Sequence, residues 1–133
     1  MKPLAFYGLI IKTFLLPMLT PTLFFKCLGD DTRLRCLILL HQQGRLCVCE
    51  LTEALDMLQP KISRHLALLR QSAILLDSRE GQWVYYQINP SLPLWARQIL
   101  DIAIQQAAQQ PMPQQDRQRL HTMANRPEPL RCC

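Results

Sequence analysis

The chain has 133 residues, a mass of 15.5 kDa, a formal net charge of +5 and a pI near 9.1. This length suits one domain that buries a core without disulfide staples, and the 49% hydrophobic content excludes a disordered chain. The basic balance favours an acidic partner, with nucleic acid ahead of an anionic membrane surface.

The cysteines do not form the pattern of a secreted, disulfide-rich domain. Two of the three pairs are nearly adjacent, whereas disulfide frameworks tie distant segments together. We therefore expect reduced thiols in a cytoplasmic protein. The first two cysteines fall in predicted helices and are interpreted as packing residues. The six are Cys27, Cys36, Cys47, Cys49, Cys132 and Cys133.

Residues 1–17 are apolar with Lys2 in front, as in a secretory signal. Lys12 and Pro17 interrupt them, and the longest uncharged run is shorter than the roughly 20 residues that span a bilayer. We expect an extension outside the fold, with a signal or an interfacial anchor as the alternative, and no membrane partner. The predicted domain covers residues 18–108, and residues 109–133 are predicted to be a flexible tail.

The first part of the domain shows helical periodicity. Apolar residues between Thr20 and Gly29 predict a short helix, and Asp30 or Asp31 can cap a second one. That second helix is apolar nearly all round, which is typical of a central buried helix. A third helix is predicted from about Cys47 to Asp56.

A turn at residues 42–45 leads to two thiols one residue apart, Cys47 and Cys49. At positions i and i+2 of a helix they would point to different sides, so one soft ion could hold both only by deforming the first turn. Cys47 and Glu50 also have the spacing of a capping box, with a thiol in place of the usual hydroxyl. The pair is thus a candidate metal site at the start of a helix.

The fourth helix, Gln59 to about Ala73, has two distinct faces. Ile62, Leu66 and Leu69 share an inward stripe with Ala73 at 3.6 residues per turn. The outer face has cations, a hydroxyl, an amide and a small residue but no carboxylate, which is typical of a surface that faces a DNA groove. Its residues are Lys61, Ser63, Arg64, Ala67 and Gln71, with His65 at the boundary.

Two strand-like segments, residues 74–79 and 82–88, follow this helix and are joined as a hairpin by residues 79–82. Two short helices joined by a tight turn describe a helix-turn-helix, and a hairpin after the second is a wing. Arg79 near the tip can reach a phosphate or the minor groove.

A last helix is predicted from Leu92 to about Ala108, with Trp95, Ile99, Ile102 and Ala103 on one stripe. A small bundle cannot cover that stripe, so we expect it to pair with the first helix in a twofold dimer. The expected fold is mainly α with a small β-hairpin (α+β), a homodimeric winged helix-turn-helix. The Gln-rich sequence beyond this helix is expected to be loose, apart from a helical turn near residues 117–124.

Four segments carry a resemblance to a known family: FKCLGDDTR (25–33), LCVCEL (46–51), QPKISRHLALLR (59–70) and GQWVYY (81–86). From about Met18 to Asp101 the chain resembles the arsenic-responsive repressors of the ArsR/SmtB winged-helix group. The resemblance implies a dimeric repressor, without catalytic residues or a catalytic cofactor, that binds an inverted-repeat operator. It implies release when trivalent arsenic or antimony binds Cys47 and Cys49, which opens expression of resistance genes.

One position departs from the family pattern. Relatives often have a third cysteine where this chain has Thr52, and a hydroxyl is a poor ligand for a soft trivalent centre. The third ligand is open between Cys132, Cys133, a small-molecule thiol and none from the protein. Zinc sensors of the group use histidine and carboxylate on the final helix, where this chain has Asp101 but no histidine, so zinc sensing is not expected.

The expected DNA contacts come from the fourth helix and the wing. Base-edge contacts are assigned to Lys61, Ser63 and Arg64 with Gln59 and His65, and backbone contacts to Arg70 and Arg79. A thiol-redox repressor that senses oxidants with the same cysteines is the alternative. A small thiol oxidoreductase is weaker, because the pair lacks the two-residue spacing of thioredoxin-like motifs. No Ser/His/Asp set or phosphate loop points to an enzyme.

Overall fold

The computed structural model describes residues 19–123, so the predicted extension 1–17, Cys132 and Cys133 lie outside the described residues. Across this part, no helix has the length and apolar character needed to cross a membrane. The elements in chain order are α2 (Pro21–Leu28), α3 (Asp31–Gln43), β1 (Arg45–Cys47), α4 (Val48–Leu55), α5 (Gln59–Gln71), β2 (Leu75–Glu80), β3 (Trp83–Ile88), α6 (Leu94–Ala107) and α7 (Pro111–His121).

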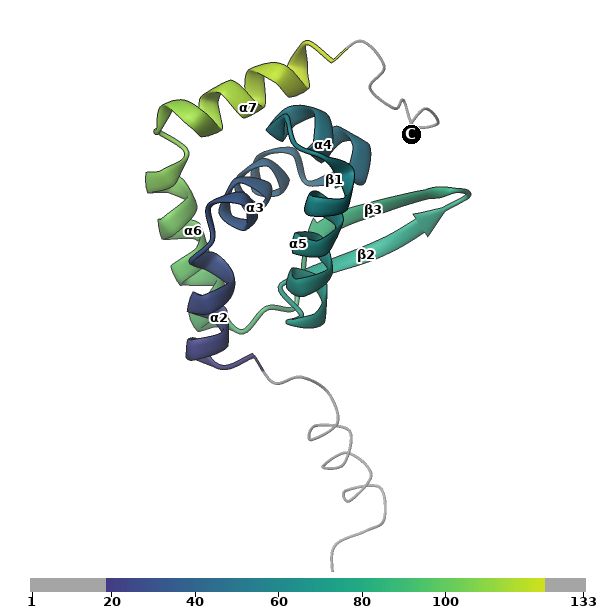
Figure 1. Ribbon diagram of the computed structural model, residues 1–133. Coiled ribbons are helices and arrows are strands. Elements are labelled where there is room, and N and C mark those ends of the chain that lie inside the picture. The colour runs from purple at the N-terminus through teal and green to yellow at the C-terminus, as the bar shows by residue number, and fades with distance from the viewer. Residues whose placement is uncertain (1–18, 124–133) are drawn as a thin grey trace, which may run out of the picture.

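Helix α3 lies at the centre of the molecule, with the other helices and the sheet arranged around it (Figure 1). It begins where the Asp30 carboxylate accepts a hydrogen bond from the Arg33 backbone N–H at 3.0 Å, and it ends at Gly44 with φ 90. Its side chains from Arg35 to Leu40 are all buried. The predicted central buried helix is confirmed.

Helices α4 and α5 form the helix-turn-helix. Ile62, Leu66 and Leu69 of α5 are completely buried, so the inward stripe is confirmed at these positions. The helix ends at Gln71, and Ala73 has φ 62, so the predicted helix was two residues too long at its end. A left-handed residue there turns the chain sharply into β2, which apolar periodicity does not reveal.

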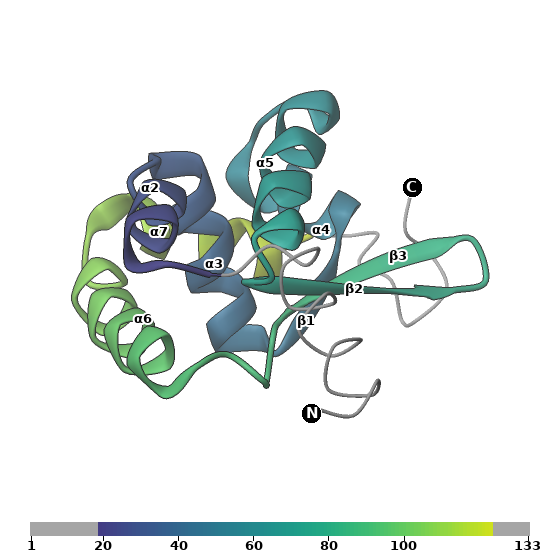
Figure 2. The same ribbon diagram turned by 90° about the horizontal axis from the view of Figure 1, so that it is seen from below.

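The wing is present as predicted, with Glu80 paired to Trp83 across a turn that contains Gly81 at φ 63. The β2–β3 hairpin projects well beyond the helices in both views (Figures 1 and 2). A third strand was missed. β1 pairs antiparallel with β3 in the order β1-β3-β2, so Arg45, predicted to end a turn, begins a strand. Three residues are too few to show strand alternation, and only the distant partner β3 makes them a strand.

Helix α6 buries Ala96, Leu100 and Ile104 against the core. The bundle leaves the predicted stripe partly uncovered, as expected, because Ile102 is 69% exposed. Trp95 meets Phe24 of α2 edge to face, with ring centroids 5.4 Å apart. Helices α2 and α6 therefore lie together at one side of the molecule (Figure 2).

The expected loose tail is wrong for residues 111–116: a helix, α7, spans 111–121 and packs across α3 and α4, so it includes most of the predicted helical turn and begins six residues before it (Figure 1). Leu120 is buried, and so is Asp116, at 0% exposure. Asp116 accepts two hydrogen bonds from Arg35 of α3, at 2.8 and 2.7 Å. A buried ion pair holds this polar helix in place, and the Gln-rich composition gives no sign of the arginine 81 residues earlier.

Candidate thiol site and nucleic-acid interface

The two candidate metal ligands meet at the junction of β1 and α4. Cys47 is both the last residue of β1 and the N-cap of α4, with extended backbone angles of φ −87 and ψ 168. Because Cys47 lies outside the helix, its Sγ comes within 3.2 Å of the Cys49 Sγ. The expectation that these sulfurs point apart is wrong, and both can face one soft ion.

Local hydrogen bonds hold this junction in shape. The buried Glu50 carboxylate accepts a hydrogen bond from the Cys47 backbone N–H at 3.0 Å, the carboxylate half of the predicted capping box. The Thr52 hydroxyl donates to the Val48 carbonyl at 2.8 Å, one turn back in the same helix. Within residues 19–123, no group of three or more His, Cys, Asp or Glu side chains is arranged to hold a metal ion.

The thiols lie against the base of the wing. Tyr85 of β3 is the register partner of Cys47 and forms a small buried cluster with it, against which Cys49 and Trp83 pack. The Arg45 guanidinium lies 4.0 Å from the centroid of the Tyr85 ring. The sequence did not predict that Tyr85 lies beside the thiols. That contact could be foreseen only if residues 45–47 were already known to form a strand.

The wing is also fastened to β1 by an ion pair. Arg45 donates two hydrogen bonds to the Glu80 carboxylate, at 2.8 and 2.7 Å. These bonds lower the pKa of the exposed Glu80 carboxyl. A single residue of β1 thus touches both the ring beside the thiols and the far end of β2.

The other two cysteines of the described chain are buried elsewhere. Burial raises the pKa of the Cys36 thiol to about 12, so this group remains protonated at neutral pH. The Cys27 Sγ lies 3.2 Å from the Ser72 Oγ at the end of α5. Both sit in the core, where they were predicted to pack.

The predicted DNA-binding side chains of α5 share an outward surface without a carboxylate. Lys61 and Arg64 are exposed, Ser63 is partly exposed, and Gln59 is exposed in the first turn. Lys61 and Arg64 also line a pocket at the turn between α4 and α5. Its other lining residues are Asp56, Met57, Leu58 and Pro60. The structure therefore brings the candidate base contacts together beside the helix N-terminus.

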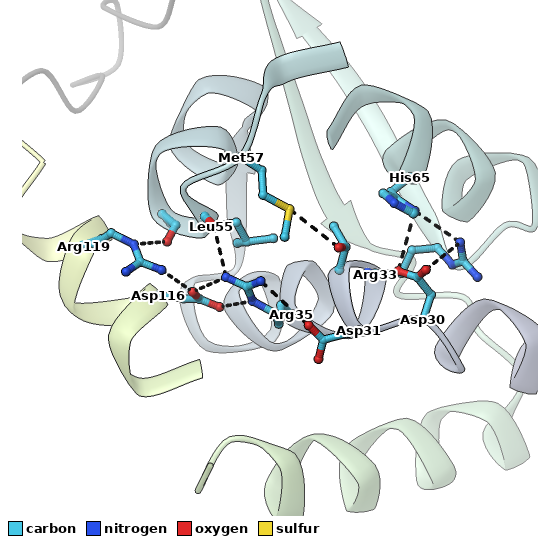
Figure 3. Close-up of polar contacts among 11 residues, drawn as sticks. Asp30, Asp31, Arg33, Arg35, Leu55, Met57, His65, Asp116 and Arg119 are labelled. Atoms are coloured by element: carbon cyan, nitrogen blue, oxygen red, sulfur yellow. Dashed lines mark hydrogen bonds and ion pairs between the residues drawn. The ribbon is translucent and has the colours of Figure 1, made fainter. Parts of the chain in front are cut away.

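The remaining candidates lie at the edges of that surface. Arg70 is exposed with its Nη1 3.4 Å from an Asp77 oxygen, and Arg79 is exposed on β2 near the wing tip. The His65 side chain is only 16% exposed, and its Nδ1 lies 3.2 Å from the Arg33 Nη1 (Figure 3). His65 differs from the others because the α2–α3 corner already engages it.

Helix α7 holds the end of α4 opposite the thiols (Figure 3). Arg119 Nε donates to the Ala54 carbonyl at 2.8 Å, and Arg35 Nη2 donates to the Leu55 carbonyl at 3.1 Å. Asp116 joins the two guanidinium groups, since it also accepts from Arg119 at 2.8 Å. Carbonyls at the end of a helix lack intrahelical donors, and here two arginines supply them.

Known proteins similar to this chain are transcriptional regulators. The arsenic resistance transcriptional regulator ArsR1 of Pseudomonas putida is 50% identical over 116 residues, which cover 86% of this chain and 89% of that protein. The arsenical resistance operon repressor of Escherichia coli is 55% identical over 85 residues, covering 64% of this chain and 73% of the repressor.

Solved structures agree with the sequence comparison. The AntR antimony-specific transcriptional repressor is 34% identical with a TM-score of 0.55, covering 67% of this chain and 80% of its own. HlyU from Vibrio cholerae is 25% identical with a TM-score of 0.58, covering 66% and 91% respectively. Residues 30–75 match the family described as "Bacterial regulatory protein, arsR family". With its winged helix-turn-helix and these relatives, the chain belongs to the ArsR family of transcriptional regulators, which are not enzymes.

Proposed function

We propose that this chain is a cytoplasmic repressor of arsenic-resistance genes that leaves its operator when As(III) or Sb(III) binds Cys47 and Cys49. The observation that carries the proposal is the 3.2 Å separation of the two sulfurs at the start of α4, directly before the helix with the carboxylate-free face. Relatives named for arsenic resistance and for antimony support the same inducers. Thiolates are the ligands that soft ions prefer.

Without inducer, α5 enters the major groove. Lys61, Ser63 and Arg64 contact base edges with Gln59, while Arg70 and Arg79 contact the backbone. The pocket beside Lys61 and Arg64 is also lined by Asp56, so it offers a base edge both hydrogen-bond donors and an acceptor. Phosphate contacts make operator affinity fall steeply with salt concentration.

Inducer binding acts on the N-terminal end of α4, at the junction with β1. Because α7 fastens the carbonyls of Ala54 and Leu55, a shift forced at Cys47 goes into the first turn of α4 and into β1. β1 is paired with β3, so the wing moves with it, and α4 carries α5 through the turn between them. Changing the bound fraction from 99:1 to 1:99 needs about 5.5 kcal/mol of differential binding, which metal–sulfur bonds can supply.

The third ligand is not Thr52 in this proposal, since its hydroxyl is already bonded to the Val48 carbonyl. Cys132 or Cys133 of the terminal segment, or a small-molecule thiol, completes a three-coordinate site. Arsenite titration of the intact chain against a chain ending before Cys132 separates these sources: loss of tight binding in the shorter chain assigns the ligand to the protein's own C-terminus.

Two copies form the operator-binding unit. Phe25 of α2 with Leu94 and Ile102 of α6 leave large apolar side chains exposed on neighbouring helices. Pairing α2 and α6 with their copies across a twofold axis covers these side chains. It also positions the two copies of α5 to bind half-sites about one DNA turn apart.

The deciding experiment is arsenite titration of the protein on its own promoter DNA. We expect the double variant Cys47→Ser with Cys49→Ser to bind the operator as the parent does and to remain bound when arsenite is added. The matched control is Cys36→Ser, whose thiol is buried and which we expect to respond like the parent. Release of the double variant by arsenite would place the inducer site elsewhere.

The same geometry favours one alternative, a thiol-redox repressor. Two sulfurs 3.2 Å apart can lose two electrons and two protons to peroxide and form a disulfide. Peroxide would then release DNA, and arsenite in the presence of excess reductant would not. The titration above, run under both conditions, distinguishes the two functions.

A further inference from the structure

The guanidinium of Arg33, at the start of α3, bridges the end of α2 and the middle of α5, and Figure 3 shows its contact with His65. Its Nε donates to the Cys27 carbonyl at 2.8 Å, and its Nη2 donates to the Lys26 carbonyl at 3.0 Å. Its Nη1 lies 3.2 Å from the Nδ1 of His65. Arg33 therefore caps α2 and holds a side chain of α5 with the same group.

The chemistry of the two partners sets the direction of that last bond. A guanidinium only donates hydrogen bonds, so the His65 Nδ1 must be the acceptor. The ring is then neutral and carries its proton on Nε2. The contact exists in one of the two protonation states of His65 and is lost in the other.

A second contact joins α2 to the end of α5. The Cys27 Sγ lies 3.2 Å from the Ser72 Oγ, in a buried position, and Ser72 is the C-cap residue of α5. The Ser72 hydroxyl also donates to the Leu68 carbonyl at 2.9 Å. Helix α5 is thus attached to α2 at its end through Ser72 and at its middle through His65.

We propose that His65 is a positioning residue for operator binding, which in its neutral form holds α5 against the α2–α3 corner through Arg33. The proposal rests on the proposed function in one respect, namely that α5 carries the DNA-binding face. When His65 is protonated, α5 keeps its attachment at Ser72 but loses the 3.2 Å hydrogen bond from Arg33, and only the longer 3.8 Å contact with Asp30 remains at its middle. The buried stripe stays in the core, but the turn with Lys61 and Arg64 loses the polar contact that restrains its orientation about that stripe.

The charges around His65 favour the neutral ring. From the α2–α3 corner, Arg33 opposes a second positive charge, and the Asp30 carboxylate at 3.8 Å favours one. From α5 itself, Lys61 and Arg64 oppose it. Desolvation is the largest influence, and the pKa of His65 lies below its ordinary value of 6.5.

The sign of the pH effect follows from this direction. Because the folded-state pKa is below the unfolded one, the contribution of neutral His65 is fully present above pH 6.5. It is lost as the pH falls from 6.5 through the folded-state pKa. Operator binding should therefore weaken on acidification, whereas a protonated His65 in direct contact with a phosphate would strengthen it.

Two substitutions distinguish the roles of the two ring nitrogens of His65, because each amide mimics one of them. In His65→Asn, the side-chain oxygen can occupy the place of Nδ1 and still accept from Arg33, without titrating. In His65→Gln, the longer amide mimics Nε2, the nitrogen directed away from Arg33, and loses the acceptor. His41 and His121 are present in both variants, so their titration cancels in the comparison.

The test measures operator affinity of the full chain between pH 8 and pH 5.5 at constant salt. We expect the parent to lose affinity steadily on acidification, approaching a loss of about two- to tenfold as His65 becomes fully protonated, the range for one hydrogen bond. His65→Asn should bind like the parent at pH 8 and show less of this loss. His65→Gln should bind about two- to tenfold more weakly already at pH 8.

Parent affinity that is constant or rises as the pH falls would overturn the proposal, and so would an undiminished loss in His65→Asn. Parent-like binding by His65→Gln would instead assign His65 a direct DNA contact. Nitrogen-15 NMR of the imidazole in the DNA-free protein should show the Nε2–H tautomer, and an Nδ1–H tautomer would also overturn it. This readout needs no operator, so it separates failure of the positioning role from failure of the proposed function.

Discussion

The buried cysteines of the described chain differ in whether their sulfurs can bind a metal ion. Cys36 lies inside α3, where burial holds its pKa near 12 and withholds the thiolate that binds metals. Cys47 is equally buried, at 1% exposure, but its sulfur adjoins that of the partly exposed Cys49. The neighbouring sulfur and the helix start, rather than exposure alone, distinguish the candidate inducer site.

Lys61 offers a residue-scale test of the DNA interface. It is exposed on α5 and lines the pocket at the helix-turn-helix, so Lys61→Ala removes one charge without a core defect. We expect weaker operator binding and a plot of log affinity against log salt that is shallower by about 0.9. Fluorescence anisotropy across a salt series measures the slope.

The matched control for this prediction is Arg117→Ala on α7. Arg117 is also an exposed cation, so the substitution makes the same change in net charge away from the interface. It should leave the salt dependence nearly unchanged. Equal slopes for Lys61→Ala and the parent would remove Lys61 from the interface.

Single residues also show where sequence reasoning sufficed. The inward face of α5 followed from the spacing of Ile62, Leu66 and Leu69, because a helix imposes that spacing locally. The close approach of Cys47 to Cys49 could not be predicted from the sequence. It requires that Cys47 end a strand, and that strand forms only because it pairs with β3, where the partner of Cys47 is 38 positions further along the chain. The boundary place of His65 was visible on the helical wheel, but its partner Arg33 was not.

At the scale of elements, α7 is the helix that the polar, Gln-rich composition of its sequence did not predict. Asp116 is buried and joins two arginines, and its removal leaves Arg119 without its carboxylate and the buried Arg35 with only the exposed Asp31 at 3.8 Å. We expect Asp116→Ala to lower the free energy of unfolding by about 3–5 kcal/mol. Urea unfolding followed by circular dichroism provides the value.

The comparison for Asp116 is Gln115→Ala, one residue earlier on the exposed side of the same helix, which should change stability by less than about 0.5 kcal/mol. A loss of that small size for Asp116→Ala would mean that α7 is not held by the buried ion pair.

The helix-turn-helix and its wing were predictable as elements, since each has a periodic pattern of its own. β1 and α7 were not. One is three residues long, and the other has a polar composition with only three buried residues. Both are stabilised by partners distant in sequence, and a local sequence pattern contains no information about such partners.

At the scale of the whole molecule, the uncovered face of α2 and α6 sets the assembly. Ile102 is 69% exposed near the centre of α6, so we expect Ile102→Lys to place a charge in the proposed dimer interface. The variant should sediment as a monomer at concentrations where the parent is dimeric, and it should lose most of its operator affinity. Analytical ultracentrifugation and a DNA-binding titration measure the two effects.

Gln118→Lys on the exposed side of α7 adds the same charge outside that face and should remain dimeric. A dimeric Ile102→Lys variant would place the interface on another surface. This pair also checks the sequence-based expectation of a twofold dimer, which a single chain does not display.

Because Trp83 lies beside the thiols, its fluorescence should respond to a metal ion bound there. The chain has two tryptophans, Trp83 packed against the Cys47–Tyr85 cluster and Trp95 against Phe24 on α2. A heavy atom captured by the sulfurs should quench the emission of Trp83 and leave Trp95 as an internal reference. The unmodified protein would then report occupancy of its own inducer site by fluorescence, before and independently of any change at the DNA.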